Sequence, residues 1–191
     1  MKEFFQEYFR NISFDVGPSQ LESLSSFFTE QSLLKGHKFI EFDDTSRKIA
    51  FIKTGMVRFF LNTFEGQEFN VTFKLENEFF MSFYTIMTKK PSPFAIEALE
   101  DSILYVADYD AVNSVLESDP FWIQVLKKMY AHNFILKAER EIQFLMHDTK
   151  TRYLNLLESR PDLVKRVPQY HLALYLGVNP VSLNRIIKSL D

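Results

Sequence analysis

The sequence predicts an α+β protein: an antiparallel β jelly roll with flanking helices, followed by a long helix and a C-terminal helix-turn-helix. Three observations predict this fold. Between residues 34 and 107, apolar side chains recur at every second position in many short runs. A helical pattern then extends from residue 119 to about 147. Two short helical patterns around a glycine come after it.

The first 35 residues show helical spacing. A break at Gly17-Pro18-Ser19 divides this region, and Ser19 is expected to cap a second helix that reaches Phe28. The apolar side chains of both segments are expected in the core. One aromatic stripe supports the prediction of helix over residues 3–35: Phe4, Phe5, Tyr8 and Phe9.

Short strands are predicted from residue 34 to residue 107. Turns rich in Gly, Asp and Asn separate them, which is typical of an antiparallel sandwich or jelly roll. A short helix is expected next, at residues 110–116. The alternating segments are residues 37–42, 48–62, 69–75, 94–99 and 103–106.

The longest helical pattern starts at Asp119-Pro120 and runs to about His147, because proline is tolerated in a first turn. One seam along it follows alternating spacings of four and three residues, as in a helix that packs on a partner helix. The alternative is that this stripe packs on the chain's own jelly roll, and both can hold for different faces. The seam predicts a homodimer through Trp122, Leu126, Met129, Asn133 and Leu136.

Two more helices are predicted before the last one. The first covers residues 149–159, and Pro161 to Val164 is expected to form a turn after it. The second covers residues 168–176. Gly177 follows, where the chain must turn sharply with a positive φ.

The last helix is predicted to start at Asn179-Pro180. The Asn side chain can cap free N–H groups, and the proline already has a helical φ. Two short helices around a three-residue turn are typical of a helix-turn-helix, whose second helix enters the major groove of DNA. An ordinary helical hairpin is the alternative reading. The apolar stripe of the last helix consists of Leu183, Ile186, Ile187 and Leu190.

Composition narrows the functional classes. The sequence has no cysteine, which excludes disulfides and thiolate metal sites and fits a reducing compartment. No signal-peptide run or membrane span occurs, so a soluble, cytoplasmic protein without a membrane partner is expected. The net charge is −3, yet from Asp148 onward seven Lys and Arg outnumber four acids. A net charge of +3 there, beside −6 elsewhere, supports a nucleic-acid-binding end.

No enzyme activity is predicted. A metal-dependent jelly-roll enzyme needs two or three His and a Glu at matching strand positions. Only His37 of the four histidines lies in the predicted sheet. The sequence also has no Gly-rich phosphate loop and no nucleophile elbow. We therefore expect no catalytic residue and no metal site.

The run PQYHLALYLGVNPVSLNRIIKSL resembles the helix-turn-helix of the Crp/Fnr family of bacterial transcription regulators. The match is carried by Leu172-Ala173, Leu176-Gly177 and the segment from Ser182 to Ile186. Two earlier runs, FIKTGMVRFF and ENEFFMSF, look like the hairpin and cassette entry of a cyclic-nucleotide-binding-like domain.

The resemblance implies three parts. Residues 1–118 would form a cyclic-nucleotide-binding-like sensor domain, residues 119–147 a central dimerisation helix, and residues 148–191 a DNA-binding domain. Because the sequence stops at Asp191, the β-wing that usually follows the last helix is expected to be incomplete.

The resemblance also implies that cyclic AMP is not the ligand. Cyclic-AMP-binding relatives use a Glu for the ribose and an Arg-Ser pair for the phosphate, whose charge needs such a partner. Here Met81 and Ser82 replace the Gly-Glu pair, and no Arg occurs between Arg58 and Arg140. The domain is expected to sense a different, less charged ligand, or none, and to hold no cofactor. The candidate ligand-binding residues are Met81, Ser82, Phe83 and Tyr84.

On the last helix, the family pattern points to Pro180, Val181 and Arg185 as the base-facing positions. Arg185 would read a base edge, whereas Val181 replaces the acid of relatives that read G-rich sites. Asn179 and Ser182 would hold phosphates. The remaining attraction to double-stranded DNA would come from Lys165, Arg166 and Lys188.

Two functions stay open at this stage. The first is a dimeric transcription regulator of the Crp/Fnr type that binds double-stranded DNA and responds to an unidentified small effector or is constitutive. The second is a ligand-binding or protein-interaction module whose DNA-binding end has decayed. A third, an enzyme built on the jelly roll, lacks the residues described above.

Overall fold

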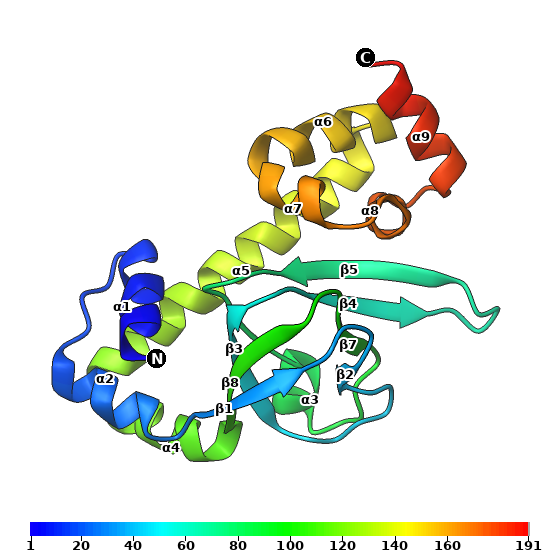
Figure 1. The fold of residues 1–191 in the computed structure, drawn as a ribbon. Coiled ribbons are helices and arrows are strands. Elements are labelled where there is room, and N and C mark those ends of the chain that lie inside the picture. The colour runs from blue at the N-terminus through cyan, green and yellow to red at the C-terminus, as the bar shows by residue number, and fades with distance from the viewer. Residues whose placement is uncertain (191) are drawn as a thin grey trace. The chain divides into compact units, whose positions relative to one another are not determined.

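A computed structural model describes residues 1–190 (Figure 1). The strands are β1 (Thr29–Leu33), β2 (Lys38–Ile40), β3 (Lys48–Thr54), β4 (Val57–Asn62), β5 (Glu68–Lys74), β6 (Phe79–Met81), β7 (Ala95–Ala98) and β8 (Ser102–Asp108). The helices before the long one are α1 (Lys2–Asn11), α2 (Pro18–Ser25), α3 (Phe83–Thr88) and α4 (Tyr109–Ser118). The others are α5 (Pro120–Met146), α6 (Thr149–Ser159), α7 (Pro161–Arg166), α8 (Gln169–Leu176) and α9 (Pro180–Lys188).

The strands form two four-stranded sheets. One has the order β1-β8-β3-β6 and the other the order β2-β7-β4-β5. In the first sheet β3 pairs antiparallel with both β8 and β6, so that Ala50 lies opposite Val106 on one side and Phe80 on the other. Eight antiparallel strands in two sheets are a jelly roll. The predicted α+β fold is confirmed.

Contacts divide the chain into two compact units. Unit 1 comprises residues 1–58 and 74–132, and unit 2 comprises residues 59–73 and 133–191. The long helix α5 and the strand β4 each contribute to both. The predicted boundaries at residues 118 and 147 stay predictions. Within residues 1–190, no helix combines the length and the apolarity needed to cross a membrane.

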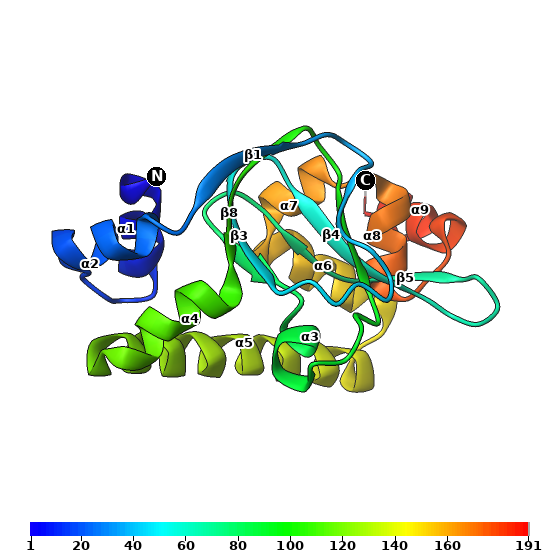
Figure 2. The ribbon, with the colours of Figure 1, turned by 90° about the horizontal axis from the view of Figure 1, so that it is seen from below.

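An aromatic cluster forms the core of unit 1. Phe5 of α1 is fully buried, and its ring centroid lies 5.0 Å from that of Phe28, 5.0 Å from that of Phe51 and 5.2 Å from that of Phe79. Edge-to-face pairs at these distances stabilise a core beyond the area that they bury. Helix α4 leads directly into α5 (Figure 2), and both helices contribute buried side chains to the same cluster.

The N-terminal region differs from the prediction of helix over residues 3–35. Helix α2 starts at Pro18, and the Gln20 side chain accepts a hydrogen bond from the Gly17 N–H at 3.2 Å, so Ser19 is not the cap. Residues 29–33 form a strand instead of a helix, because β1 pairs along its whole length with β8, from Thr29 opposite Val106 onward. Backbone pairing with a strand distant in sequence therefore determined the secondary structure of this segment.

The turn expected at Pro161 to Val164 is also wrong. These residues begin α7, whose Leu163 is 2% exposed. Proline is favourable in the first turn of a helix, so Pro161 starts a helix where we had expected a turn. The long helix, α6, α8 and α9 are confirmed at the predicted positions.

The first part of the predicted dimer seam packs inside unit 1. Trp122 is 2% exposed, and its ring lies 5.4 Å from that of Phe9. Leu126 and Met129 are partly buried against the same cluster. Trp122 is therefore wrong as a dimer contact, because its surface is already covered by the N-terminal helices. Asn133 and Leu136 are exposed and stay predictions.

Gly55 provides a test of the jelly roll. Its φ is +99°, and an added Cβ would lie 2.7 Å from Cβ and 2.8 Å from Cα of Ser102. Gly55→Ala should lower the free energy of unfolding by about 3 kcal/mol or more, through backbone strain and overpacking. Gly66 also has a positive φ, but an added Cβ there meets no atom within 4 Å. Gly66→Ala should cost only about 1–2 kcal/mol in denaturant unfolding. Equal losses would contradict the packing described here.

Candidate functional sites

The junction between α8 and α9 in unit 2 is a tight turn. Gly177 has a φ of +72°, in the left-handed region where glycine ends many helices. Its neighbour Val178 donates its N–H to the carbonyl of Ala173 at 3.0 Å. The Asn179 Oδ1 then accepts a hydrogen bond from the Ser182 N–H at 2.8 Å and caps α9. The predicted positive φ and the predicted cap are both confirmed.

The two helices are joined by their apolar faces. Leu183 of α9 and Ala173 of α8 are fully buried, and Leu172 and Leu176 are nearly so. Ala173 has no side chain beyond Cβ, so the helices can approach closely at this point. The opposite face of α9 is accessible to solvent. It carries Val181, Asn184, Arg185 and Lys188.

A pair of arginines holds the end of α8. Arg140 of α5 donates from Nη2 to the Tyr175 carbonyl at 2.9 Å, and Arg152 of α6 donates from Nη2 to the Leu176 carbonyl at 2.9 Å. The carbonyls in the last turn of a helix lack intrahelical partners and carry partial negative charge. The two guanidinium groups therefore stabilise the helix end that precedes the turn.

Phe144 lies in contact with both arginines. The guanidinium carbon of Arg140 and that of Arg152 each lie 4.5 Å from the Phe144 ring centroid. The Nε atoms of both arginines have no hydrogen-bond partner among residues 1–190, and the cation–π contact gives the cations a favourable contact instead. A Cβ at Gly177 would come within 3.0 Å of the Phe144 ring. The arginine–phenylalanine cluster and the turn therefore fit each other closely.

The hairpin of β4 and β5 supports α8 from another side. The Asn70 Nδ2 donates to the His171 carbonyl at 2.8 Å, and the ring of Phe73 lies 5.3 Å from that of Tyr175. Asn70 is 2% exposed. Unit 2 therefore holds α8 by side chains from α5, α6 and the hairpin. No sequence pattern predicts these contacts, because they join residues up to 101 positions apart.

The remaining basic residues that are predicted to contact DNA lie in the last turn of α7. Lys165 is exposed and Arg166 is half-buried. Both precede α8 by a few residues. The structure thus brings all the basic residues predicted at DNA into unit 2.

In unit 1 the predicted ligand-binding residues do not share one environment: Ser82 is buried, whereas Phe83 and Tyr84 are exposed. Ser82 and Ser92 lie 3.1 Å apart through their hydroxyls, and Thr85 lies 2.8 Å from Ser82. All three are about 1% exposed. The hydroxyls of this segment therefore form hydrogen bonds with one another. Phe83 and Tyr84 are both 40% exposed on α3.

The nearest arginine to that segment in the sequence is already paired. Arg58 is 5% exposed, and its Nε donates to Glu97 Oε2 at 2.5 Å. The Glu97 carboxylate balances the charge of this buried guanidinium. A buried ion pair leaves little capacity for a second charged partner, because separating it would strand a charge.

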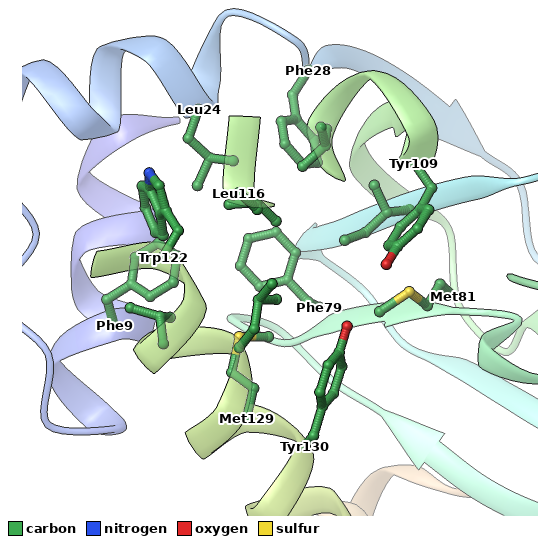
Figure 3. Close-up of a pocket in the computed structure, with 14 residues that line it drawn as sticks. Phe9, Leu24, Phe28, Phe79, Met81, Tyr109, Leu116, Trp122, Met129 and Tyr130 are labelled. Carbon is green, nitrogen blue, oxygen red and sulfur yellow. The ribbon is translucent and has the colours of Figure 1, made fainter. Parts of the chain in front are cut away.

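Met81, one of the four predicted ligand residues, lines an apolar cavity (Figure 3). The cavity has a volume of about 40 Å³ and lies among α2, α4, α5, β3 and β6 in unit 1. At roughly 24 cal/mol per Å³, an empty cavity of this volume costs the folded state about 1 kcal/mol. Its lining residues are Phe9, Leu24, Phe28, Ile49, Phe79, Met81, Tyr109, Val112, Leu116, Trp122, Val125, Leu126, Met129 and Tyr130.

Two hydroxyls lie at one side of this cavity. Figure 3 shows the oxygens of Tyr109 and Tyr130 pointing toward one another. Burial, followed by a hydrogen bond with Tyr130, raises the pKa of Tyr109 above its usual value. Tyr109 also donates to the Asn113 Oδ1 at 3.1 Å. The Tyr109 phenol therefore stays a neutral donor and acceptor at physiological pH.

The second half of α5 exposes an apolar seam that the sequence analysis missed. Ile135 is 53% exposed, Ile142 56% and Leu145 78%. Together with Ala138 they follow spacings of three and four residues, the repeat of a helix that packs on another helix. The seam lies two positions later in the heptad than the predicted one. The exposed fractions of these side chains revealed the seam.

Residues 30–119 match the family model described as the cyclic nucleotide-binding domain. No curated protein sequence matches the chain. The fold is cyclic-nucleotide-binding-like.

Solved structures share this fold over most of the chain. FixK2 from Bradyrhizobium japonicum has a TM-score of 0.73 and 17% identity, covering 85% of this chain and 84% of that one. The c-di-GMP-responsive global regulator CLP from Xanthomonas campestris has a TM-score of 0.72 and 13% identity, covering 91% of each. A proposed transcriptional regulator of the Crp/Fnr family from Eubacterium rectale has a TM-score of 0.72 and 14% identity, covering 96% and 87%.

Replacing Arg140 tests how α8 is held. Arg140→Met removes the donor to Tyr175 and the contacts with two aromatic rings, while keeping an unbranched side chain. It should lower the free energy of unfolding by about 2 kcal/mol and speed amide exchange around Gly177. Lys137 is exposed one turn earlier on the same helix, so Lys137→Met is the matched control and should change neither. An Arg140→Met protein with wild-type exchange would contradict this role.

Proposed function

We propose that this protein is a transcription regulator of the Crp/Fnr type that binds double-stranded DNA through α9. The observation that carries the proposal is the pair α8 and α9, with a tight capped turn, buried apolar faces and an outward face that holds Arg185 and Lys188. A helix supported in this way can lie in the major groove. The fold shared with CLP, which is named as a regulator linked to gene expression, supports the same function.

On α9 the residues have distinct proposed roles. Arg185 reads a base edge, since a guanidinium can donate two hydrogen bonds to guanine. Val181, 62% exposed, contacts the groove without hydrogen bonding. Ser182 and the Asn179 Nδ2 bind phosphate, because the Asn179 Oδ1 is already the helix cap. Lys165, Arg166 and Lys188 add charge that acts on any sequence.

The protein acts as a homodimer in this proposal. The exposed seam of Ile135, Ala138, Ile142 and Leu145 supports a contact with the same seam of a second copy. Apolar side chains exposed at helical spacing are stabilised when a partner covers them. A two-fold dimer would present two copies of α9 to two DNA half-sites.

The dimer contact is tested by Ile142→Glu. Two carboxylates would then face each other across an apolar seam, so the dimer dissociation constant should rise by about 100-fold or more. Analytical ultracentrifugation at micromolar concentration measures the change. Lys137→Glu, at an exposed position outside the seam, should leave the dimer intact. A wild-type monomer, or an Ile142→Glu dimer, would rule out this seam.

We also propose that the effector is not a cyclic nucleotide. The hydroxyls of Ser82 and Ser92 hydrogen-bond to each other, and the Arg58 guanidinium is paired with Glu97. A cyclic phosphate carries a charge that needs a cationic partner when buried. The hydroxyl cluster and the ion pair support a sensor domain that takes an uncharged ligand or none.

Arg185 and Lys188 separate specific from general DNA binding. Arg185→Ala should cost about 1–3 kcal/mol at the preferred base and relax specificity there. Lys188→Ala should weaken the binding of all DNA sequences alike and reduce the salt dependence of that binding. Both side chains are exposed, so neither change should lower the melting temperature by more than a degree or two. Selection of bound fragments followed by titration measures both effects.

The same experiment decides against the proposal in two cases. If the wild-type protein binds no duplex even at low salt, the chain is an interaction module and not a regulator. If Arg185→Ala binds DNA like the wild type but unfolds more easily, Arg185 is structural and the reading of bases lies elsewhere.

A further inference from the structure

A polar groove in unit 1 is separate from the sites described above. It lies between α1 with the loop that follows it, the turn that joins β5 to β6, and α5. Its volume is about 520 Å³, within the range of roughly 300–1,000 Å³ that is typical of small-molecule sites. All of its lining residues belong to unit 1. They are Tyr8, Asn11, Ile12, Ser13, Glu76, Asn77, Glu78, Lys128 and His132.

The turn between β5 and β6 forms an acidic wall of this groove. The Glu76 Oε1 accepts a hydrogen bond from the Gly55 N–H at 2.8 Å. The Glu78 Oε2 accepts one from the Leu75 N–H at 2.8 Å, and its Oε1 lies 3.1 Å from the Lys74 ammonium. These contacts hold both carboxylates in place. A carboxylate has about four acceptor positions, so each can accept further hydrogen bonds from a ligand.

Polar atoms without partners lie beside the acidic wall. Burial, followed by the charge of Glu78, raises the pKa of Tyr8 to about 12, so its phenol is a neutral donor at physiological pH. Its hydroxyl makes no hydrogen bond within residues 1–190. The Asn77 Oδ1 is buried and finds no donor among the same residues. Because an unpaired buried acceptor destabilises the folded state, a molecule that brings a donor to this turn is favoured there.

Helix α5 forms a basic wall of the groove. Lys128 and His132 are exposed and lie four positions apart, which places them on the same face of the helix. The Lys128 ammonium lies 5.3 Å from the ring centroid of Phe14 and forms no ion pair within the described part of the chain. An ammonium and a ring N–H are donors that suit a carboxylate. The charge of Lys128 is therefore available to an anionic group.

We propose that this groove binds a small zwitterion of the amino-acid or short-peptide class, with its ammonium at the acidic wall and its carboxylate at the basic wall. The apolar part of the ligand contacts Ile12 and the ring of Tyr8. A ligand with charge of one sign only would meet like charge at one of the two walls, which is unfavourable. This groove is additional to the Ser82–Ser92 cluster, for which we propose an uncharged ligand or none.

A matched set of probes tests both charges of the ligand. L-alanyl-L-alanine carries both, its N-acetylated form lacks the ammonium, and its C-terminal amide lacks the carboxylate. Isothermal titration calorimetry should show saturable binding of the free dipeptide and about tenfold weaker binding of each blocked form. The melting temperature should rise with the concentration of the free dipeptide. The assay contains no DNA, so its outcome is independent of the proposed regulator function.

Two substitutions assign the charges to the walls. Lys128→Met should make the free dipeptide and its amide bind equally, because the partner of the carboxylate is lost. Glu76→Gln keeps an acceptor for the Gly55 N–H and should make the free and N-acetylated dipeptides bind equally. Lys127→Met and Glu7→Gln change exposed neighbours outside the groove and should bind like the wild type. If Glu76→Gln does not fold, Lys128→Met, at an exposed position, decides the test by itself.

Three outcomes overturn the proposal. The first is heat that does not saturate with the free dipeptide at millimolar concentration. The second is binding of either blocked form as tightly as the free dipeptide, which shows that the missing charge is not recognised. The third is a Lys128→Met protein that still prefers the free carboxylate over the amide, because the basic wall then does not hold it.

Discussion

Burial of Phe5 against the first sheet is the interaction on which unit 1 depends. The sheet face around Phe51 and Phe79 is aromatic and must be covered, and α1 covers it with a side chain that is fully buried. Phe5 packs edge-to-face on Phe51 and tilted on Phe79, and these ring contacts hold α1 against the sheet. Phe9, one turn later, then meets Trp122 of α5. The N-terminal helices therefore determine which face of α5 is inside.

This constraint explains two features of α5. Because Trp122 and Val125 are used in the core of unit 1, the first turns of the helix cannot offer this stripe to a partner. Exposed apolar side chains occur farther along the helix, among them Ile135, Leu136 and Ile142. The cavity has the same origin. Large, stiff rings from several elements meet around α5, and they do not fill the space between them as completely as smaller side chains would.

Unit 2 is held together differently. Besides the apolar packing of its short helices, polar contacts to backbone carbonyls position α8. Arg140 and Arg152 bind the free carbonyls at the end of α8, while Asn70 binds the carbonyl of His171. Such contacts are directional, so they fix the orientation of α8 more narrowly than apolar packing alone. A helix that must fit a groove of fixed width benefits from that precision.

The sequence by itself determined the local features of this protein. Asn179 and Pro180 start a helix, Gly177 turns the chain, and the alternation of residues 34–107 makes strands, because each effect acts within a few residues. The tertiary structure decided what depends on distant partners. Thr29 to Leu33 became a strand only because β8 offered its backbone, and Glu97 became an ion-pair partner only because Arg58 lies beside it. The apolar positions of α5 are visible in the sequence, and only packing on α1 and α2 could decide that Trp122 is buried, since helical spacing shows that a face is apolar but not what covers it.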